Sequence, residues 1–281
     1  RHSFPTRRSS DLFGNVNLDY VTTNTLKLLT FWNKKVPVAK GASEPLLRQT
    51  VDAANVHGET GLDGYDFPEP DTSSLLEGHA IHHMAKVIRE STEKITLVPI
   101  GPLTNIALLF KVYPEVKEKI EEIVLMGGST GRGNKGVLSE FNIHADPEAA
   151  KIVFASGVPI VMAGLDVGWK ALVFPEDSAK IKTFNRNGEM IYSLLQRYRG
   201  RGLKNGLKMY DGCAIAYLLQ PEMFEAVDTF VDIEVNGTYT SGATIVDLNG
   251  YFDKPHNAKV LMDLDQEEFI KWLLDALKKC E

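Results

Sequence analysis

The fold class is decided by residues 94–128, which read KITLVPIGPLTNIALLFKVYPEVKEKIEEIVLMGG. Residues 94–100 are an apolar run between turn signals, which predicts a buried strand. A Gly-Pro pair ends this strand, and a helix is predicted over residues 103–112. Residues 123–126 are a second short apolar strand that ends in two glycines. A strand, a helix and a further strand in this order indicate a right-handed βαβ unit of a parallel sheet.

The alternation of strands and helices continues on both sides of this unit. Helices are predicted at residues 21–32, 75–90, 146–156 and 266–279, and further strands at residues 36–39, 158–167 and 259–264. Residues 229–246 contain an Asn-Gly pair between two strand-like runs, which predicts an antiparallel hairpin. Since no internal repeat or linker is visible, the sequence predicts one α/β domain with an open, mostly parallel sheet and helices on both faces.

Composition and charge limit the classes of function that the chain can have. A hydrophobic fraction of 43% and a charged fraction of 24% are typical of a globular protein and exclude disordered or fibrous classes. The formal charge of -6 argues against a nucleic-acid-binding surface, so a small-molecule partner is favoured. The two cysteines, Cys213 and Cys280, form no disulfide framework, which favours the cytoplasm. No window reaches the roughly 18 apolar residues that a membrane helix needs.

Residues 1–12, which read RHSFPTRRSSDL, differ from the rest of the chain. They are basic and serine-rich and have neither helical nor strand periodicity. A transit peptide shares this composition, but Pro5 and the lack of an apolar face argue against an amphipathic helix. We predict that residues 1–12 are foreign sequence, such as translated cloning or adapter sequence, and that the domain comprises residues 13–281.

Ligands of an open parallel sheet bind beyond the carboxyl ends of its strands, so the segments after the strands are candidate sites. After residues 94–100, a strand-to-helix turn in which Thr104 or Asn105 caps backbone groups is expected, and it needs no ligand. After residues 123–126 the loop GGSTGRGNKG contains a G-x-G-x-x-G pattern. A dinucleotide site is disfavoured because no helix follows at once and no acidic residue stands at the required distance.

Acidic and amide side chains in two segments suit a sugar or a metal. Glu140 and Asn142 share one side if their segment is extended, and such groups bind vicinal hydroxyls; satisfying the loop backbone is an equally weighted alternative. Asp211 opens an apolar helix, where it is either a helix cap or a ligand of a hard metal ion.

Histidines stand in two places. His57 lies in the glycine-rich loop HGETGLDG, where it can donate to a substrate hydroxyl or leaving-group nitrogen, although solvent exposure is commoner. His79 and His83 have the spacing of a metal pair on a helix, with His82 between them. No third ligand with convincing spacing is visible, so a solvated helical face is favoured.

Six strings, in order and spacing, closely resemble the inosine-uridine nucleoside hydrolase family: GNVNLDYVTTNTLKLL, VHGETGLDG, LVPIGPLTNIA, VLMGGS, the stretch from residue 134 with EFN and ADPEAA, and MYDGCAIAYLLQPEMF. The resemblance covers residues 13–277. It implies a single Rossmann-like domain, a bound Ca²⁺, and hydrolysis of the N-glycosidic bond of ribonucleosides to base and ribose. It also implies nucleoside catabolism and salvage, and assembly into dimers or tetramers.

The resemblance also implies roles for individual residues. Asp211 and the backbone carbonyl of Ile100 match Ca²⁺ ligands, and His57 matches a histidine near the leaving base. The positions that match ribose-binding residues are Asn15, Met126, Asn134, Glu140 and Asn142. A Ca²⁺ ion with about 6 to 8 oxygen ligands can hold two ribose hydroxyls and a water, while Glu140 and the amides favour a sugar with oxocarbenium character.

Two features depart from the family pattern. The family's usual histidine before the metal-binding aspartate is Tyr210 here, and a phenol with a pKa near 10 is poorly matched to neutral pH unless perturbed. Leaving-group activation is therefore assigned to Tyr210, to His57 or to aromatic stacking. The second departure is the family's opening D-x-D-x-x-x-D-D loop, which supplies most Ca²⁺ carboxylates and the base that activates water, and which does not precede Phe13. Asp11 stands alone in the stretch expected to be foreign.

The missing Asp-rich loop leads to an expectation about activity. We expect the chain as printed to bind Ca²⁺ poorly and to hydrolyse inosine or uridine negligibly, whereas a chain that carries the Asp-rich loop does both. The competing class is a non-catalytic nucleoside- or ribose-binding protein. The sequence does not decide between purine and pyrimidine bases, because base contacts come from variable loops.

Overall fold

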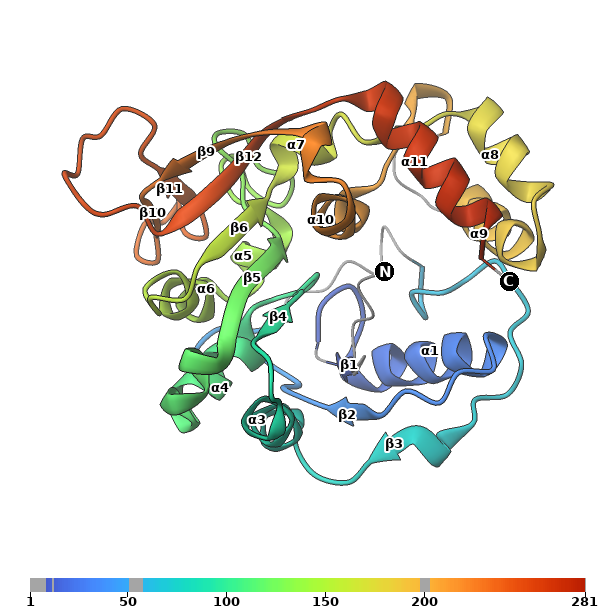
Figure 1. The fold of residues 1–281 in the computed structure, drawn as a ribbon, viewed down its shortest axis with the longest axis horizontal. Helices are drawn as coiled ribbons and strands as arrows, with labels where there is room; N and C mark the ends of the chain where they lie inside the picture. Colours follow the sequence, from blue (N-terminus) through green and yellow to red (C-terminus); the bar gives the residue numbers. More distant parts are fainter. Residues whose placement is uncertain (1–8, 12, 51–57, 198–202, 281) are drawn as a thin grey trace.

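The sheet at the centre of the molecule has the strand order β4-β5-β6-β12-β9 (Figure 1). The computed structural model describes residues 9–11, 13–50, 58–197 and 203–280. The five strands are β4 (Ile95–Leu97), β5 (Ile120–Met126), β6 (Ile160–Ala163), β12 (Ala258–Leu264) and β9 (Phe224–Thr229). Neighbours from β4 to β12 are parallel, and β9 is antiparallel to β12. The predicted open, mostly parallel sheet is confirmed.

A second sheet of three strands has the order β1-β2-β3, and both of its pairings are parallel. Its strands are β1 (Ser9–Asp11), β2 (Val38–Lys40) and β3 (Leu75–Leu76). Helix α1 (Leu18–Phe31) packs on β1 and β2. Strand β1 falls within residues 1–12, so part of that stretch takes part in strand pairing. The foreign origin of residues 1–12 stays a prediction.

Helices cover both faces of the central sheet (Figure 1). On one face lie α3 (Ala80–Glu90), α4 (Thr104–Val112) and α6 (Pro147–Phe154), and on the other α7 (Leu165–Gly168), α10 (Tyr210–Leu219) and α11 (Gln266–Lys278). Successive side chains of a strand point to opposite faces. In β5, Ile123 and Leu125 therefore join the apolar core beneath α3, α4 and α6, whereas Val124 joins the core beneath α10 and α11.

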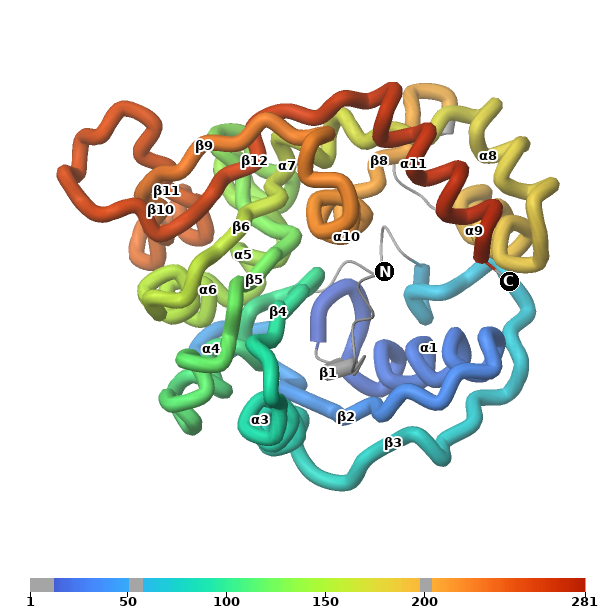
Figure 2. The backbone as a smooth tube through the Cα atoms, in the orientation of Figure 1, coloured from blue at the N-terminus to red at the C-terminus, as the bar shows by residue number. Residues whose placement is uncertain are grey.

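Smaller elements connect these layers. They are η1 (Thr72–Ser74), η2 (Pro114–Lys119), α5 (Phe141–Ala145), β7 (Leu172–Val173), α8 (Pro175–Lys182), α9 (Arg186–Arg197), η3 (Leu203–Asn205), β8 (Leu207–Lys208), η4 (Pro221–Met223), β10 (Val231–Ile233) and β11 (Thr244–Val246). Strands β10 and β11 pair antiparallel at the edge of the molecule beside α6 (Figure 2). None of the helices in the described part of the chain is long and apolar enough to cross a membrane.

The predicted helix at residues 75–90 and the predicted strand at residues 158–167 are both longer than the elements found in the structure. Residues 75–90 begin as β3, and α3 starts only at Ala80, because the His79 ring accepts a hydrogen bond from the N–H of Ile81 at 3.3 Å and caps the helix. The predicted strand at 158–167 ends at Ala163, and Gly164 then precedes the short helix α7.

The predicted hairpin exists, but its connection is longer than a tight Asn-Gly turn. Strands β10 and β11 are joined by residues 234–243, which we call the hairpin loop. The side chain of Glu234 accepts hydrogen bonds from the N–H groups of Asn236 and Gly237 at 2.6 and 3.0 Å. The Asn-Gly pair therefore forms a local turn inside the hairpin loop rather than the turn that joins the strands.

Candidate active site

Glu140 is a buried carboxyl at the carboxyl end of β5, with 2% of its surface exposed. Its Oε1 accepts a hydrogen bond from the N–H of Asn142 at 2.9 Å, and its Oε2 accepts from Gly128 at 3.1 Å and Ile143 at 3.2 Å. Burial raises the pKa of Glu140 to about 7, against the lowering effect of these donors, and the nearby Asp211 carboxylate adds to the rise. The side chain is therefore rigidly held and titrates near neutrality.

A short helix follows Glu140 directly, so the condition under which Glu140 and Asn142 would share one side, an extended segment, is not met. Glu140 is the N-cap of α5, where its carboxylate satisfies the first N–H groups of the helix. Asn142 lies in this helix, and its Nδ2 donates to the carbonyls of Met126 at 3.0 Å and Ile100 at 3.4 Å. Both side chains therefore satisfy loop backbone, which is one of the two predicted alternatives, and binding of a sugar stays a prediction.

Met126 and Ile100 mark the ends of two neighbouring strands. Met126 is the last residue of β5 and is 4% exposed, with its Sδ atom 3.3 Å from the Nδ2 of Asn142. Ile100 follows β4, and its side chain is 49% exposed. The sequence-predicted residues Met126, Asn142 and Ile100 are thus in direct contact, beside Glu140.

The glycine-rich loop folds back on itself. The N–H groups of Asn134, Lys135 and Gly136 all point to the carbonyl of Ser139, at 3.1, 3.2 and 3.4 Å. A phosphate site would need such N–H groups to face a ligand. Asn134 is exposed, and its Oδ1 accepts from the N–H of Phe141 at 2.9 Å, which places it at the start of α5.

Tyr210 and Asp211 open helix α10. Met209 is the N-cap and no side chain caps this end, so the cap interpretation of Asp211 is wrong. Solvent reaches Asp211, but the surrounding protein desolvates its carboxylate enough to raise its pKa to about 6. The Tyr210 ring packs on α7: a Cβ atom added to Gly168 would lie 2.2 Å from the ring. Helix α10 packs on β5 and β6, and the Asp211 carboxylate is near enough to Glu140 to contribute to its raised pKa.

The structure does not bring every predicted residue to this cluster. Asn15 is exposed and lies close to Phe13, whose N–H donates to the carbonyl of Ala42 at 3.1 Å. Within the described residues no hydrogen bond links Asn15 to Glu140, although the neighbouring Gly14 lies beside Pro102, two residues after Ile100. His57 lies outside the described residues.

The three histidines of residues 79–83 have separate roles. His79 caps α3, His82 is 2.7 Å from the hydroxyl of Tyr113, and His83 is 2.7 Å from the carbonyl of Glu77. Within the described residues, no group of three or more His, Cys, Asp or Glu side chains is placed to hold a metal ion. Of the three rings only His82 is exposed, and His79 and His83 are half-buried.

The profile of the inosine-uridine preferring nucleoside hydrolases matches residues 10–271. The chain belongs to this family. The non-specific ribonucleoside hydrolase RihC of Escherichia coli (strain SMS-3-5 / SECEC) is 47% identical over 264 residues, which cover 94% of this chain and 86% of that protein. RihC of Klebsiella pneumoniae is also 47% identical over 264 residues, with the same coverage.

Solved structures agree with the family assignment. A purine-preferring ribonucleoside hydrolase from Gardnerella vaginalis superimposes with a TM-score of 0.87 at 27% identity, over 96% of this chain and 88% of that chain. An inosine-guanosine nucleoside hydrolase superimposes with a TM-score of 0.89 at 27% identity, over 96% and 90% of the two chains. This nucleoside hydrolase is therefore an enzyme of the N-ribohydrolase class, and the predicted α/β fold is confirmed.

Asp146 begins the helix predicted over residues 146–156 and is its N-cap, as the sequence indicated, but its contacts with neighbouring segments were missed. Asp146 is fully buried and accepts hydrogen bonds from Thr104 Oγ1 at 2.6 Å and from the N–H of Leu46 at 2.9 Å. Asn105 accepts from the N–H of Ala42 at 2.9 Å, and the cap of α4 is Leu103. Asn105 therefore caps a backbone group, as the sequence indicated, although neither Thr104 nor Asn105 caps the start of α4. Both tie the start of α4 to neighbouring segments, and their place after a strand was the available signal.

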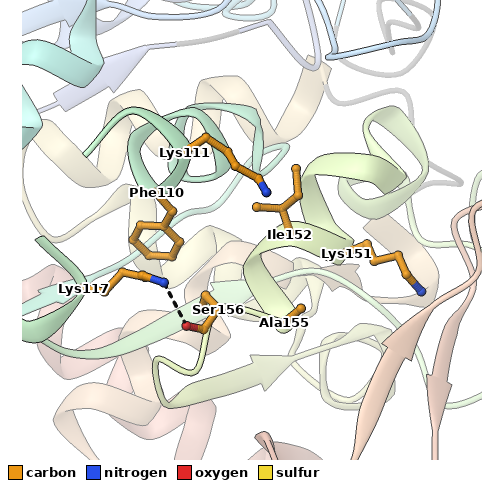
Figure 3. Close-up of a pocket in the computed structure, with 7 residues that line it drawn as sticks. All are labelled: Phe110, Lys111, Lys117, Lys151, Ile152, Ala155 and Ser156. Carbon is orange, nitrogen blue, oxygen red and sulfur yellow. Dashed lines mark hydrogen bonds between the residues drawn. The ribbon is translucent and has the colours of Figure 1, made fainter. Parts of the chain in front are cut away.

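Two cavities of the nucleoside hydrolase lie apart from this cluster. The pocket in Figure 3 is lined by the end of α4, residue 117 and the end of α6, and Lys117 Nζ lies 3.4 Å from the carbonyl of Ser156. Helices of βαβ units run against their strands, so this pocket lies towards the amino ends of the strands. A second cavity of about 640 Å³ is lined by residues 58–67, α1 and α9. Neither contains a predicted site residue.

Proposed function

We propose that this nucleoside hydrolase cleaves the N-glycosidic bond of ribonucleosides and releases a free base and ribose. The observation that carries the proposal is the contact cluster of Glu140, Asn142 and Met126 at the ends of β4 and β5. The names of the RihC relatives, non-specific ribonucleoside hydrolases at 47% identity, support the same substrate class.

The cluster suits a ribose ring that becomes positively charged. Because the Nδ2 of Asn142 is held by two strand-end carbonyls, its amide oxygen is turned the other way, as an acceptor for a sugar hydroxyl. Glu140 is fixed by three N–H donors, so its carboxylate needs little reorganisation as charge develops on the sugar. Asn134, beside the start of α5, would complete the polar contacts to the ribose.

We assign the cofactor as Ca²⁺, held in part by Asp211 and the carbonyl of Ile100. These are hard oxygen donors and fit Ca²⁺ in kind, but the ion takes about 6 to 8 oxygens, so they fill only part of its shell. The described residues contain no group of three or more acidic, histidine or cysteine side chains placed to add to them. A bound ion would hold ribose hydroxyls and lower the pKa of a water nucleophile.

Tyr210 is the candidate group for the leaving base. It directly precedes Asp211 at the start of α10, and its ring is fixed against Gly168. A phenol there can donate a proton to the base or present a face to it. Replacing Tyr210 by Phe keeps the face and removes the proton, so a loss of turnover would identify a proton donor and unchanged turnover would identify packing. His57 stays a prediction.

The test is a reducing-sugar assay on a panel that includes inosine and uridine, with and without added Ca²⁺, beside Ca²⁺ titration calorimetry. Base release that chelation abolishes supports the proposal. Nucleoside binding without release would support the competing class, a non-catalytic nucleoside- or ribose-binding protein. Assembly into dimers or tetramers and a cytoplasmic location also stay proposals, which size-exclusion chromatography and cell fractionation test.

A further inference from the structure

The imidazole of His144 joins two parts of the chain that are far apart in sequence. His144 lies in α5 and is half-buried. Its Nδ1 is 3.2 Å from the hydroxyl of Ser139. Burial lowers the pKa of the ring, and the backbone of Ser241 in the hairpin loop lies close enough to the ring to oppose that shift. A neutral imidazole has one donor and one acceptor nitrogen. One ring therefore lies between the segment before α5 and the hairpin loop.

The hairpin loop packs against His144 with no spare room. Gly242 has a φ of +82°, and a Cβ atom added there would lie 2.8 Å from the Cα of His144. Ser139 and Ala243 form an isolated antiparallel bridge beside this contact. The backbone of the hairpin loop is thus shaped to approach α5 closely, and a side chain larger than hydrogen at residue 242 would push it away.

Arg48 holds the hairpin loop from its other side. Its guanidinium donates to Ser241 Oγ at 2.7 Å and to the carbonyl of Val235 at 2.6 Å. The same group pairs with Glu148 of α6 at 2.6 Å. The hairpin loop therefore lies between Arg48 and His144. Because the hydrogen bonds of Arg48 fix the loop, His144 packs against a segment with a defined position.

Ser139 connects His144 with the residues proposed to bind ribose. Its carbonyl accepts hydrogen bonds from the N–H groups of Asn134, Lys135 and Gly136, and it directly precedes Glu140. The carbonyl of Glu140 in turn accepts from the N–H of His144 at 2.8 Å. A shift of Ser139 would therefore displace Asn134 and Glu140 together.

We infer that His144 is a positioning residue of this nucleoside hydrolase: by tying the hairpin loop to Ser139, it sets the places of Asn134 and Glu140 for the sugar. The inference rests on the proposed function for its catalytic consequence, but its structural content stands on the contacts above. The ring works in the neutral state. Its burial and the charges of Lys135 and Arg48 disfavour protonation, while Glu148 is engaged by Arg48 and Glu234 by N–H groups of its own loop.

The test compares four variants of the full chain. His144→Phe removes the ring's donor and acceptor, His144→Gln keeps one of each, and Ser139→Ala removes the hydroxyl partner. His256→Phe is the matched control, because His256 is exposed and no contact described above involves it. Hydrogen–deuterium exchange of residues 133–139 reports the loop directly, and kcat and KM for inosine and uridine report the site.

We expect His144→Phe to speed amide exchange over residues 133–139 about tenfold and to lower kcat/KM about tenfold, the effect of losing about one hydrogen bond. The loss should fall on kcat as well as KM, because Glu140 acts on the developing charge. His144→Gln should stay within about threefold of the wild type, since its amide keeps a donor and an acceptor. His256→Phe should match the wild type.

Unchanged exchange over residues 133–139 in His144→Phe would overturn the inference, as would equal losses in the Gln and Phe variants. If His144→Phe does not fold, the smaller Ser139→Ala change decides by the same exchange measurement, faster exchange supporting the inference and wild-type exchange overturning it. If the wild type releases no base, the proposed function fails, whereas the exchange measurement still decides whether His144 positions the loop.

Discussion

Glu140 combines the capping of a helix with deep burial of its carboxyl group. Its two oxygens accept three backbone N–H groups, which stabilises a charged carboxylate, while burial opposes that charge and raises its pKa to about 7. A residue that only capped α5 would be as effective on the surface, where desolvation is small. The buried position is what makes this carboxylate suited to a developing positive charge.

At the residue scale we predict that Glu140→Gln lowers kcat by about 100-fold or more, the size of effect seen when an electrostatic group facing developing charge is removed. Gln keeps one acceptor oxygen, so part of the cap survives and the loss of stability should be about 1 to 3 kcal/mol. Turnover and thermal unfolding measure the two effects. Glu118→Gln, on the exposed side of η2, is the control. Near-normal turnover by Glu140→Gln would remove Glu140 from the site.

The sequence predicted which residues form the site better than how they are held. The resemblance named Met126, Glu140 and Asn142, and the structure brings them into contact. It could not show that Glu140 caps a helix, because α5 has only 5 residues and is too short to show a helical period. The contact between His144 and the hairpin loop could not be predicted either, because it joins residues that are distant in sequence.

At the scale of elements, Arg48 and Glu148 fasten the hairpin loop to α6. The Arg48 guanidinium hydrogen-bonds the Glu148 carboxylate and holds its pKa below the ordinary value. A carboxyl whose folded pKa is lowered stabilises the fold above its ordinary pKa, and this contribution is lost as pH falls through the folded value. The clamp should therefore be fully effective at pH 7 and weaken under acidic conditions.

Glu148→Gln should accordingly reduce stability by about 1 kcal/mol at pH 7, a modest value because both side chains are partly exposed. The difference from the wild type should shrink as pH falls below the pKa of Glu148 in the folded protein. Urea unfolding at pH 7 and at acidic pH measures it, with Glu118→Gln as the exposed control. A difference that stays constant with pH would show that the charge of Glu148 is irrelevant to the clamp.

The boundaries of helices and strands could be predicted where a regular pattern continues over many residues. They were predicted wrongly where a single residue ends the element. Helix α11, predicted at residues 266–279, is found at Gln266–Lys278. The strand predicted at 158–167 ran too long, because the apolar residues after Gly164 are as suited to a buried helix turn as to a strand. The helices α8 and α9 were not predicted, although Pro175 at the first position of α8 is a common start signal.

At the scale of the whole molecule, the two apolar cores share their strands. Phe154 is 2% exposed in the core beneath α3, α4 and α6, and Phe269 is fully buried in the core beneath α10 and α11. Ile160 and Val161 are neighbours in β6 and enter opposite cores. A strand that leaves the sheet removes side chains from both cores at once. The two cores should therefore unfold together. The number of domains was predictable from the lack of a linker, but this sharing depends on the register of the sheet.

Phe154→Ala and Phe269→Ala should each cost about 3 to 5 kcal/mol, the range for truncating a buried Phe, and each variant should unfold in one transition. Tryptophan fluorescence, measured with Trp32 and Trp169 replaced by Phe in every protein compared, gives the decisive comparison, because the remaining Trp272 packs on Phe269 with ring centroids 5.8 Å apart. If the cores are coupled, Phe154→Ala, on the opposite face, lowers the fluorescence midpoint as much as the circular-dichroism midpoint. A fluorescence midpoint that stays at the wild-type value while ellipticity is lost earlier would show that the two faces unfold as separate units.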